Sequence, residues 1–232
     1  NMQLTLRAEP PSATVLVQAQ VNNEHMVWLQ NGAELIVEDM TFDALDIERV
    51  FLVDDSELTL RRSTLMNGRG HQGALIRLGG SSSNTLDVED CVFADSIATG
   101  AHGNDDGGGH IFIEHGDVTI DRTVFRNGEA TNSRGGSIRI DGGQLVVSES
   151  EFVDNTARRA GAVYCRPADG SDDECRFTDN RFVENVVDGQ SPNAAALFIR
   201  NADIVHVGRN VFCDNTSTDV MNRGGALRLQ DL

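Results

Sequence analysis

The sequence of 232 residues contains no lysine, one tryptophan, one tyrosine and four prolines. All 19 basic residues are therefore arginines, and with 36 acidic residues the net charge is −17. Nucleic acids require a basic protein surface, so this balance argues against a nucleic-acid partner. No apolar run approaches the roughly 18 residues of a membrane span, so we expect no membrane-spanning segment in this sequence. The four cysteines are too few for a disulfide scaffold and too irregularly spaced for a zinc site.

Repetition is the most prominent feature of the chain. A short apolar–X–apolar unit recurs along its whole length, and a turn and a second alternating pair, such as Leu35/Val37 or Leu145/Val147, follow each unit. Apolar residues at every second position are typical of β-strands, in which successive side chains point to opposite faces. A coil of roughly 23–35 residues cannot bury its apolar face alone, so successive coils must stack. We therefore predict one all-β domain over residues 1–232, a right-handed parallel β-helix of about eight coils.

Three more kinds of residue recur at fixed positions of the repeat and support this prediction. In stacked coils, each kind would form a column that runs from rung to rung. Pairs of small residues, such as Gly108-Gly109 and Gly135-Gly136, precede the first strands and allow a tight approach without Cβ crowding. Asparagines near the end of each coil are expected to bond to the next rung; they are Asn155, Asn185 and Asn215, with Asn67 and Asn127 one position earlier. A large apolar residue five positions beyond the second pair should stack in the core about 4.8 Å from its neighbours. The members of this column are Phe42, Leu65, Phe93, Phe125, Phe152, Phe182 and Phe212.

Two of these motifs resemble a known repeat. Phe-Val-Asp-Asn (152–155), Phe-Val-Glu-Asn (182–185) and Phe-Cys-Asp-Asn (212–215) match a Phe-X-X-Asn pattern, and Gly-Gly-Ala-Leu (224–227) resembles the Gly-Gly-Ala-aliphatic pattern paired with it. Together they are similar to the repeats of bacterial polymorphic outer-membrane proteins, and more broadly to pectin-lyase-like surface proteins. The resemblance implies a right-handed β-helix that is secreted or exposed on a bacterial cell surface and is often adhesive. We accordingly expect the chain to be a fragment of a larger exported protein.

The centre of the first strand in each coil should face outward. Its column contains the only tryptophan and the only tyrosine of the chain, interleaved with arginines: Trp28, Phe51, Arg77, Phe112, Arg139, Tyr164, Phe198 and Arg228. A continuous exposed stripe of this kind marks a contact surface, which here could bind a glycan or a cell-surface protein. Two alternatives remain, that a long loop covers this face or that the arginines only stack on aromatic neighbours one rung away.

The residues at the outward positions of the strands also argue against catalysis. Glycoside hydrolysis needs two carboxyl groups about 5 to 9.5 Å apart, and the outward centres of the first and second strands offer no acidic pair. The absence of lysine removes one common base, although arginine could substitute, and no catalytic residue can be assigned. The sequence thus favours a non-enzymatic binding module. The alternatives are a polysaccharide-active lyase or hydrolase of the pectin-lyase-like fold, or a structural spacer.

Two polar loops are weaker candidates for binding a metal ion. His102, Asp105, Asp106 and His110, with His115 nearby, have residue types that suit a transition metal, but their spacing matches no standard motif. The turn containing Asp169, Ser171, Asp172, Asp173 and Glu174 could bind calcium through oxygen ligands, although it lacks the EF-hand order. Solvated turns are the simpler interpretation of both, and we expect no cofactor.

The cysteines fall into two kinds of position. Cys165 and Cys175 end one strand and begin the next within one coil, so we predict a disulfide between them, which fits an exported protein. Cys91 and Cys213 lie four rungs apart, on the order of 19 Å, and should be free thiols. The terminal rungs have unpaired edges, which could make end-to-end or dimer contacts.

Overall fold

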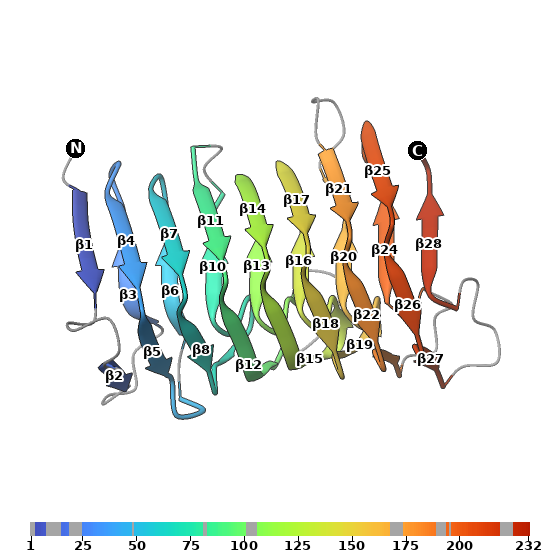
Figure 1. Ribbon diagram of the computed structural model, residues 1–232, viewed down its shortest axis with the longest axis horizontal. Helices are drawn as coiled ribbons and strands as arrows, with labels where there is room; N and C mark the ends of the chain where they lie inside the picture. Colours follow the sequence, from blue (N-terminus) through green and yellow to red (C-terminus); the bar gives the residue numbers. More distant parts are fainter. Residues whose placement is uncertain are drawn as a thin grey trace.

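The computed structural model describes residues 3–7, 15–18, 25–47, 49–80, 83–100, 106–167, 174–188, 194, 196–218 and 225–232. Each strand in these ranges pairs in parallel with the equivalent strand of the neighbouring coil, so the chain winds into a parallel β-helix. The coils lie side by side along the long axis, from β1 at the N-terminal end to β28 at the C-terminal end (Figure 1). The predicted all-β solenoid fold is confirmed. Among the described residues, no helix is long and apolar enough to cross a membrane.

Three sheets form the walls of the helix. Sheet 1 holds the first strand of each coil: β3 (His25–Leu29), β6 (Arg49–Val53), β10 (Ile76–Leu78), β13 (Ile111–Ile113), β16 (Ile138–Ile140), β20 (Val163–Cys165), β24 (Leu197–Arg200) and β28 (Leu227–Gln230). Sheet 2 holds the second strand: β1 (Gln3–Arg7), β4 (Glu34–Glu38), β7 (Glu57–Arg61), β11 (Thr85–Glu89), β14 (Asp117–Asp121), β17 (Gln144–Ser148), β21 (Glu174–Thr178) and β25 (Ile204–Gly208).

Sheet 3 carries the predicted phenylalanine column. Its main path is β2 (Val15–Gln18), β5 (Met40–Asp43), β8 (Thr64–Met66), β12 (Val92–Ala98), β15 (Val124–Arg134), β18 (Glu151–Val153), β22 (Arg181–Val183) and β26 (Val211–Cys213). The short strands β9 (Arg69–Gly70), β19 (Thr156–Arg159), β23 (Val186–Val187) and β27 (Thr216–Ser217) extend it.

The core is a stack of equivalent layers, because residues in register on neighbouring rungs point the same way. Phe93, Phe125, Phe152, Phe182 and Phe212 stack with ring centroids 4.8–4.9 Å apart, as the sequence predicted. The inward pairs of sheet 2 are buried beside them, for example Leu86 and Val88 or Leu145 and Val147. Alternation along the strands therefore identified the core correctly over most of the chain.

One rung departs from the predicted register. Phe51 pairs with Val27 and Ile76, and is fully buried, so it points into the core rather than outward. The outward position between Trp28 and Arg77 belongs to Leu52. The error has a simple cause: residues 50–53 are all apolar, and a continuous apolar run does not show which of its members face inward.

The turns are held by ladders of side chains that bond to backbone on neighbouring rungs. Asn185 accepts a hydrogen bond from the backbone N–H of Asn155 at 3.1 Å and donates one to the carbonyl of Phe152 at 2.9 Å. Asn215 repeats both contacts one coil further on. The predicted asparagine column is confirmed, although the left-handed backbone occurs one residue earlier, at Asp154, Glu184 and Asp214, a position that Asn67 and Asn127 occupy in other coils.

The cysteines lie as predicted. Cys165 and Cys175 form a disulfide that joins the end of β20 to β21, with their Cα atoms 6.6 Å apart. Cys91 and Cys213 are free. The Cys91 thiol is part of a turn ladder, since it accepts from the backbone N–H of Ser63 and donates to the carbonyl of Glu89. Burial raises its pKa to about 11, so it is a structural thiol.

Candidate functional site

The predicted aromatic and arginine stripe is mostly buried. Phe112, Arg139, Tyr164 and Phe198 are each no more than 3% exposed. Trp28 remains 51% exposed, and Arg77 and Arg228 are half-buried. The expectation of one continuous exposed stripe is therefore wrong, and Phe51 does not belong to it.

The cover over this outer face of sheet 1 comes from the residues that precede the first strands. Gly107 pairs with both Gln72 and Arg134, so these segments form a small ladder of their own. The backbone carbonyl of Asp106 accepts hydrogen bonds from the Ser133 hydroxyl and from the guanidinium of Arg139, which places this ladder above the outward side chains. This face is thus covered, although by short local segments of the chain rather than by the long loop of the alternative.

Stacking between arginines and rings fills the covered layer. The guanidinium carbon of Arg139 lies 5.2 Å from the centroid of Phe112, and that of Arg228 lies 4.8 Å from Phe198, in each case one rung away. Arg134, from the end of β15, lies 5.0 Å from the ring of Tyr164. Cation–π contacts of this kind contribute about 0.5–2 kcal/mol each, more when desolvated. The column is therefore chiefly part of the packing.

The metal candidates do not come together. His102 and Asp105 lie outside the described residues, and no group of three metal-ligating side chains occurs within those described. His110 is fully buried between Phe93 and Phe125, where its Nδ1 lies 3.1 Å from the Ser137 hydroxyl and its Nε2 lies 3.2 Å from the carbonyl of Arg126. Burial lowers the pKa of His110 to about 3. It is a neutral core residue whose two ring nitrogens are already occupied by protein partners.

The calcium candidate stays a prediction. Asp169, Ser171, Asp172 and Asp173 lie outside the described residues. Glu174, at the start of β21, forms an ion pair with Arg176 at 2.6 Å.

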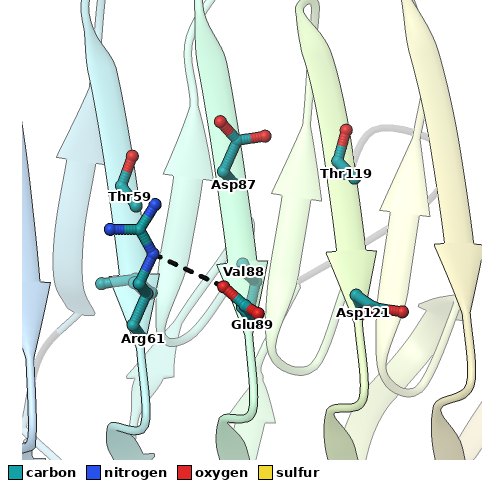
Figure 2. A pocket seen from close by; sticks show the side chains of 8 residues that line it. Thr59, Arg61, Asp87, Val88, Glu89, Thr119 and Asp121 are labelled. Atoms are coloured by element: carbon teal, nitrogen blue, oxygen red, sulfur yellow. Dashed lines mark ion pairs between the residues drawn. The ribbon is translucent and has the colours of Figure 1, made fainter.

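A depression lies on the outer face of sheet 2. It has a volume of about 220 Å³ and spans the three neighbouring strands β7, β11 and β14. Figure 2 shows its polar side chains standing off the strands, with Asp87 between the hydroxyls of Thr59 and Thr119. Arg61, Glu89 and Asp121 form a second row below them, and Leu60 and Val88 complete the lining.

Register explains why these side chains meet. Thr59, Asp87 and Thr119 are direct partners on successive strands, and so are Arg61, Glu89 and Asp121. Neighbouring strands lie about 4.8 Å apart, so each row presents its polar groups at a regular spacing. Asp87 is exposed, and within the part of the chain that the structure describes its carboxylate takes part in no ion pair and no side-chain hydrogen bond. Of the three carboxylates that line the depression, it is the one that no arginine engages.

The lower row is held by arginines. Glu89 lies 3.5 Å from Arg61, and it also pairs with Arg122, which contacts Asp90 at 2.9 Å and Asp121. These contacts raise the pKa of Arg122, with its hydrogen bond to Asp90 as the largest cause. Arg122 has a left-handed backbone, as do Asp90 and Arg62 at the same turn of neighbouring coils. The turn thus brings opposite charges face to face on successive rungs.

The central outward column of each second strand, taken alone, does not reveal this site. Asp87 is in that column, but Glu89 and Asp121 are at the strand ends, one position before the turn. The alternation Leu86–Asp87–Val88–Glu89 already contained the signal, since both acidic residues face outward on one strand. Only the register showed that Asp121 lies beside Glu89.

Comparison with known proteins identifies one family. The family model described as "Right handed beta helix region" matches residues 50–229. This match covers more than half of the chain and supplies the handedness that was predicted. No curated protein matches, and no solved structure matches.

Proposed function

Because the chain belongs to the right-handed β-helix region family, we propose that it is a non-enzymatic binding module that holds a glycan chain against the outer face of sheet 2. The observation that carries this proposal is the depression over β7, β11 and β14, in which Asp87 stands between two threonine hydroxyls. A β-helix offers a long, rigid and flat surface, and the proposed site lies on such a surface rather than on a loop.

The chemistry of the lining suits a polymer with repeated hydroxyl groups. Thr59, Asp87 and Thr119 offer hydrogen-bond donors and acceptors in a row whose spacing repeats with the strands, about 4.8 Å. The chain's charge of −17 and the carboxylates of Glu89 and Asp121 repel anionic polymers. The ligand class is therefore a neutral glycan, or one that carries amino groups.

An exported location is part of the proposal. The disulfide between Cys165 and Cys175 supports it, because disulfides persist in oxidising compartments. The resemblance of residues 152–155, 182–185 and 212–215 to polymorphic outer-membrane protein repeats supports a bacterial cell surface or its surroundings as the site of action. Adhesion to glycans or to other cells would follow from such a location.

A glycan-array screen followed by titration tests the proposal. We expect neutral or amino-sugar polymers to bind. Asp87→Asn should raise the dissociation constant at least tenfold, because a hydrogen bond to a charged group contributes about 1.5–3 kcal/mol. Asp188→Asn, at an exposed aspartate that directly follows β23 of sheet 3, is the matched control and should bind as the wild type does. Absence of glycan binding by the wild type, or equal loss in both variants, would refute the proposal.

One observation favours a second candidate, polysaccharide hydrolysis. Asp87, Glu89 and Asp121 line a single depression on the neighbouring strands β11 and β14. The strand spacing of about 4.8 Å places such carboxyl groups close to the separation of about 5–9.5 Å that glycosidases use. Glu89 and Asp121 are already engaged by arginines, which is why binding is preferred. Product analysis of the glycans that bind separates the two: reducing ends that appear with the wild type and disappear with Asp87→Asn would establish hydrolysis instead.

A further inference from the structure

The outward column of sheet 1 repeats one arrangement of an aromatic ring and a guanidinium group. Phe112, Tyr164 and Phe198 each have the guanidinium carbon of an arginine 4.8–5.2 Å from the centroid of the ring. Trp28 is the exception, since within the described part of the chain no arginine stacks on its ring. Tryptophan is the best aromatic partner for a cation. The strongest cation–π acceptor of the column is therefore the one that the chain itself does not use.

Trp28 is also open to solvent. It is 51% exposed, whereas Phe112, Tyr164 and Phe198 lie in the covered layer and are no more than 3% exposed. His25 packs edge-on against the indole, with ring centroids 5.6 Å apart and an interplanar angle of 68°. This contact holds the indole in place and leaves half of the residue accessible to a ligand.

Arg139 shows how this fold holds a guanidinium group. Its guanidinium carbon lies 5.2 Å from the ring of Phe112, its register partner on the preceding rung. The same group donates to the carboxylate of Asp141, two residues further along the chain. The arrangement thus has two anchors, a ring on one rung and a carboxylate two residues after the arginine on the next rung.

The N-terminal end of the column has both anchors but no arginine. Trp28 is the register partner of Leu52 on the next rung, so Leu52 takes the position of the arginine. Asp54 follows two residues later, and its backbone N–H donates to the carbonyl of Leu29 at 2.9 Å, which extends the pairing of the sheet to this residue. Asp54 is exposed and, among the described residues, its carboxylate has no ion pair and no side-chain hydrogen bond. Its Oδ1 lies beside Gly79 of the next coil, and an exposed side chain of this kind can change rotamer to meet a ligand.

We propose that Trp28 and Asp54 form a docking site for an arginine side chain of a partner polypeptide, whose guanidinium group stacks on the indole and pairs with the carboxylate as that of Arg139 does within the chain. A planar guanidinium group can stack and donate hydrogen bonds at the same time, which an ammonium group cannot. Leu52 adds apolar surface for the methylene groups of the incoming arginine. The net charge of −17 attracts a basic partner. The site lies on another wall than the glycan surface of sheet 2 and does not depend on it.

Fluorescence of the intact protein tests this proposal, because Trp28 is the only tryptophan of the chain and the emission reports this site alone. The probes are tetra-arginine, tetra-lysine and the neutral sugar cellotetraose, each titrated at physiological ionic strength. We expect tetra-arginine to change the emission saturably and to bind more tightly than tetra-lysine. Cellotetraose should leave the emission unchanged.

Three variants locate the binding, with calorimetry as the readout where the tryptophan is lost. Trp28→Leu should bind tetra-arginine at least about fivefold more weakly. Asp54→Asn should weaken binding about two- to fivefold. Leu52→Arg supplies the cation from within the chain, so it should change the emission of Trp28 without any ligand and should weaken binding as Trp28→Leu does. Asp188→Asn, which removes an exposed carboxylate after β23, is the matched control for Asp54→Asn and should bind as the wild type does.

Each outcome decides the proposal. No change of emission with tetra-arginine overturns it without any need for variants. Equal affinity for tetra-lysine, or equal weakening by Asp54→Asn and Asp188→Asn, means general attraction between opposite charges and overturns it as well. A response to cellotetraose without one to tetra-arginine makes Trp28 a sugar site instead. Asp87→Asn should leave the response to tetra-arginine unchanged, so failure of the glycan proposal would not be confused with failure of this one.

Discussion

His110 makes the stability of this fold depend on pH. In the folded chain its ring is fully buried against Phe93 and Phe125. A carbonyl can only accept, so Nε2 carries the proton and donates to the carbonyl of Arg126, while Nδ1 accepts from the hydroxyl of Ser137. A second proton on Nδ1 would reverse the hydrogen bond with Ser137, whose hydroxyl can also accept, and would leave an unsolvated charge in the core. The folded state therefore holds His110 neutral.

The magnitude follows from the two pKa values. Burial lowers the pKa of His110 from 6.5 to about 3. Because the folded value is the lower one, the unfolded chain binds the extra proton first. The contribution of neutral His110 to the free energy of unfolding is fully present above pH 6.5. It is lost as the pH drops towards 3, by up to about 5 kcal/mol in total. At pH 4.5 the loss should already be about 3 kcal/mol.

Denaturation with guanidinium chloride at pH 7.5 and pH 4.5 measures this loss. Other groups titrate in the same window, so the informative quantity is the difference between the wild type and His110→Gln, which retains a polar side chain that does not titrate. We expect the wild type to lose about 3 kcal/mol more than the variant between the two pH values. Equal losses in both proteins would refute the assignment of this pH dependence to His110.

Three further predictions test the fold. Reduction of the Cys165–Cys175 disulfide should lower the free energy of unfolding by about 3 kcal/mol, the loop-closure value for its short span, measured with and without dithiothreitol; no change would contradict it. Asn185→Ala leaves two buried backbone groups without their side-chain partner and should lower the free energy of unfolding by about 2–4 kcal/mol, measured by denaturation. Asn215→Ala, in the last coil, should lower it by less. Equal losses in the two variants would count against the asparagine ladder. Gly136→Ala places a Cβ against a backbone carbonyl of the next coil and should cost about 1–3 kcal/mol in the same assay, whereas Gly225→Ala meets nothing within 4 Å and should be neutral; similar effects would contradict the close approach.

Most of the fold could be predicted because its signals are local. Alternation at period two identifies the two sides of a strand, and repetition of the same pattern coil after coil identifies which strands become neighbours. The stack from Phe93 to Phe212 and the asparagine column follow from these two facts alone. The disulfide also followed, because Cys165 and Cys175 replace inward residues on either side of a single turn.

The candidate sites depended on information that alternation does not contain. The sequence showed that Arg139 and Tyr164 point away from the core, yet the segments around Asp106 and Arg134 fold over them and bury them. A period of two identifies the side of the strand on which a residue lies, but it does not reveal whether another segment covers that side.

Register is the other contribution of the tertiary structure. The sequence by itself determined the coil, its core columns and the disulfide between β20 and β21, because each depends on residues close together in the chain. Only the stacking of coils decided that Glu89 lies beside Asp121, that Arg134 faces Arg159, and that Phe51 turns inward. Coil lengths vary, so the alignment of one rung on the next is set by packing and backbone pairing between residues far apart in sequence. The proposed glycan surface on sheet 2 is a product of that alignment.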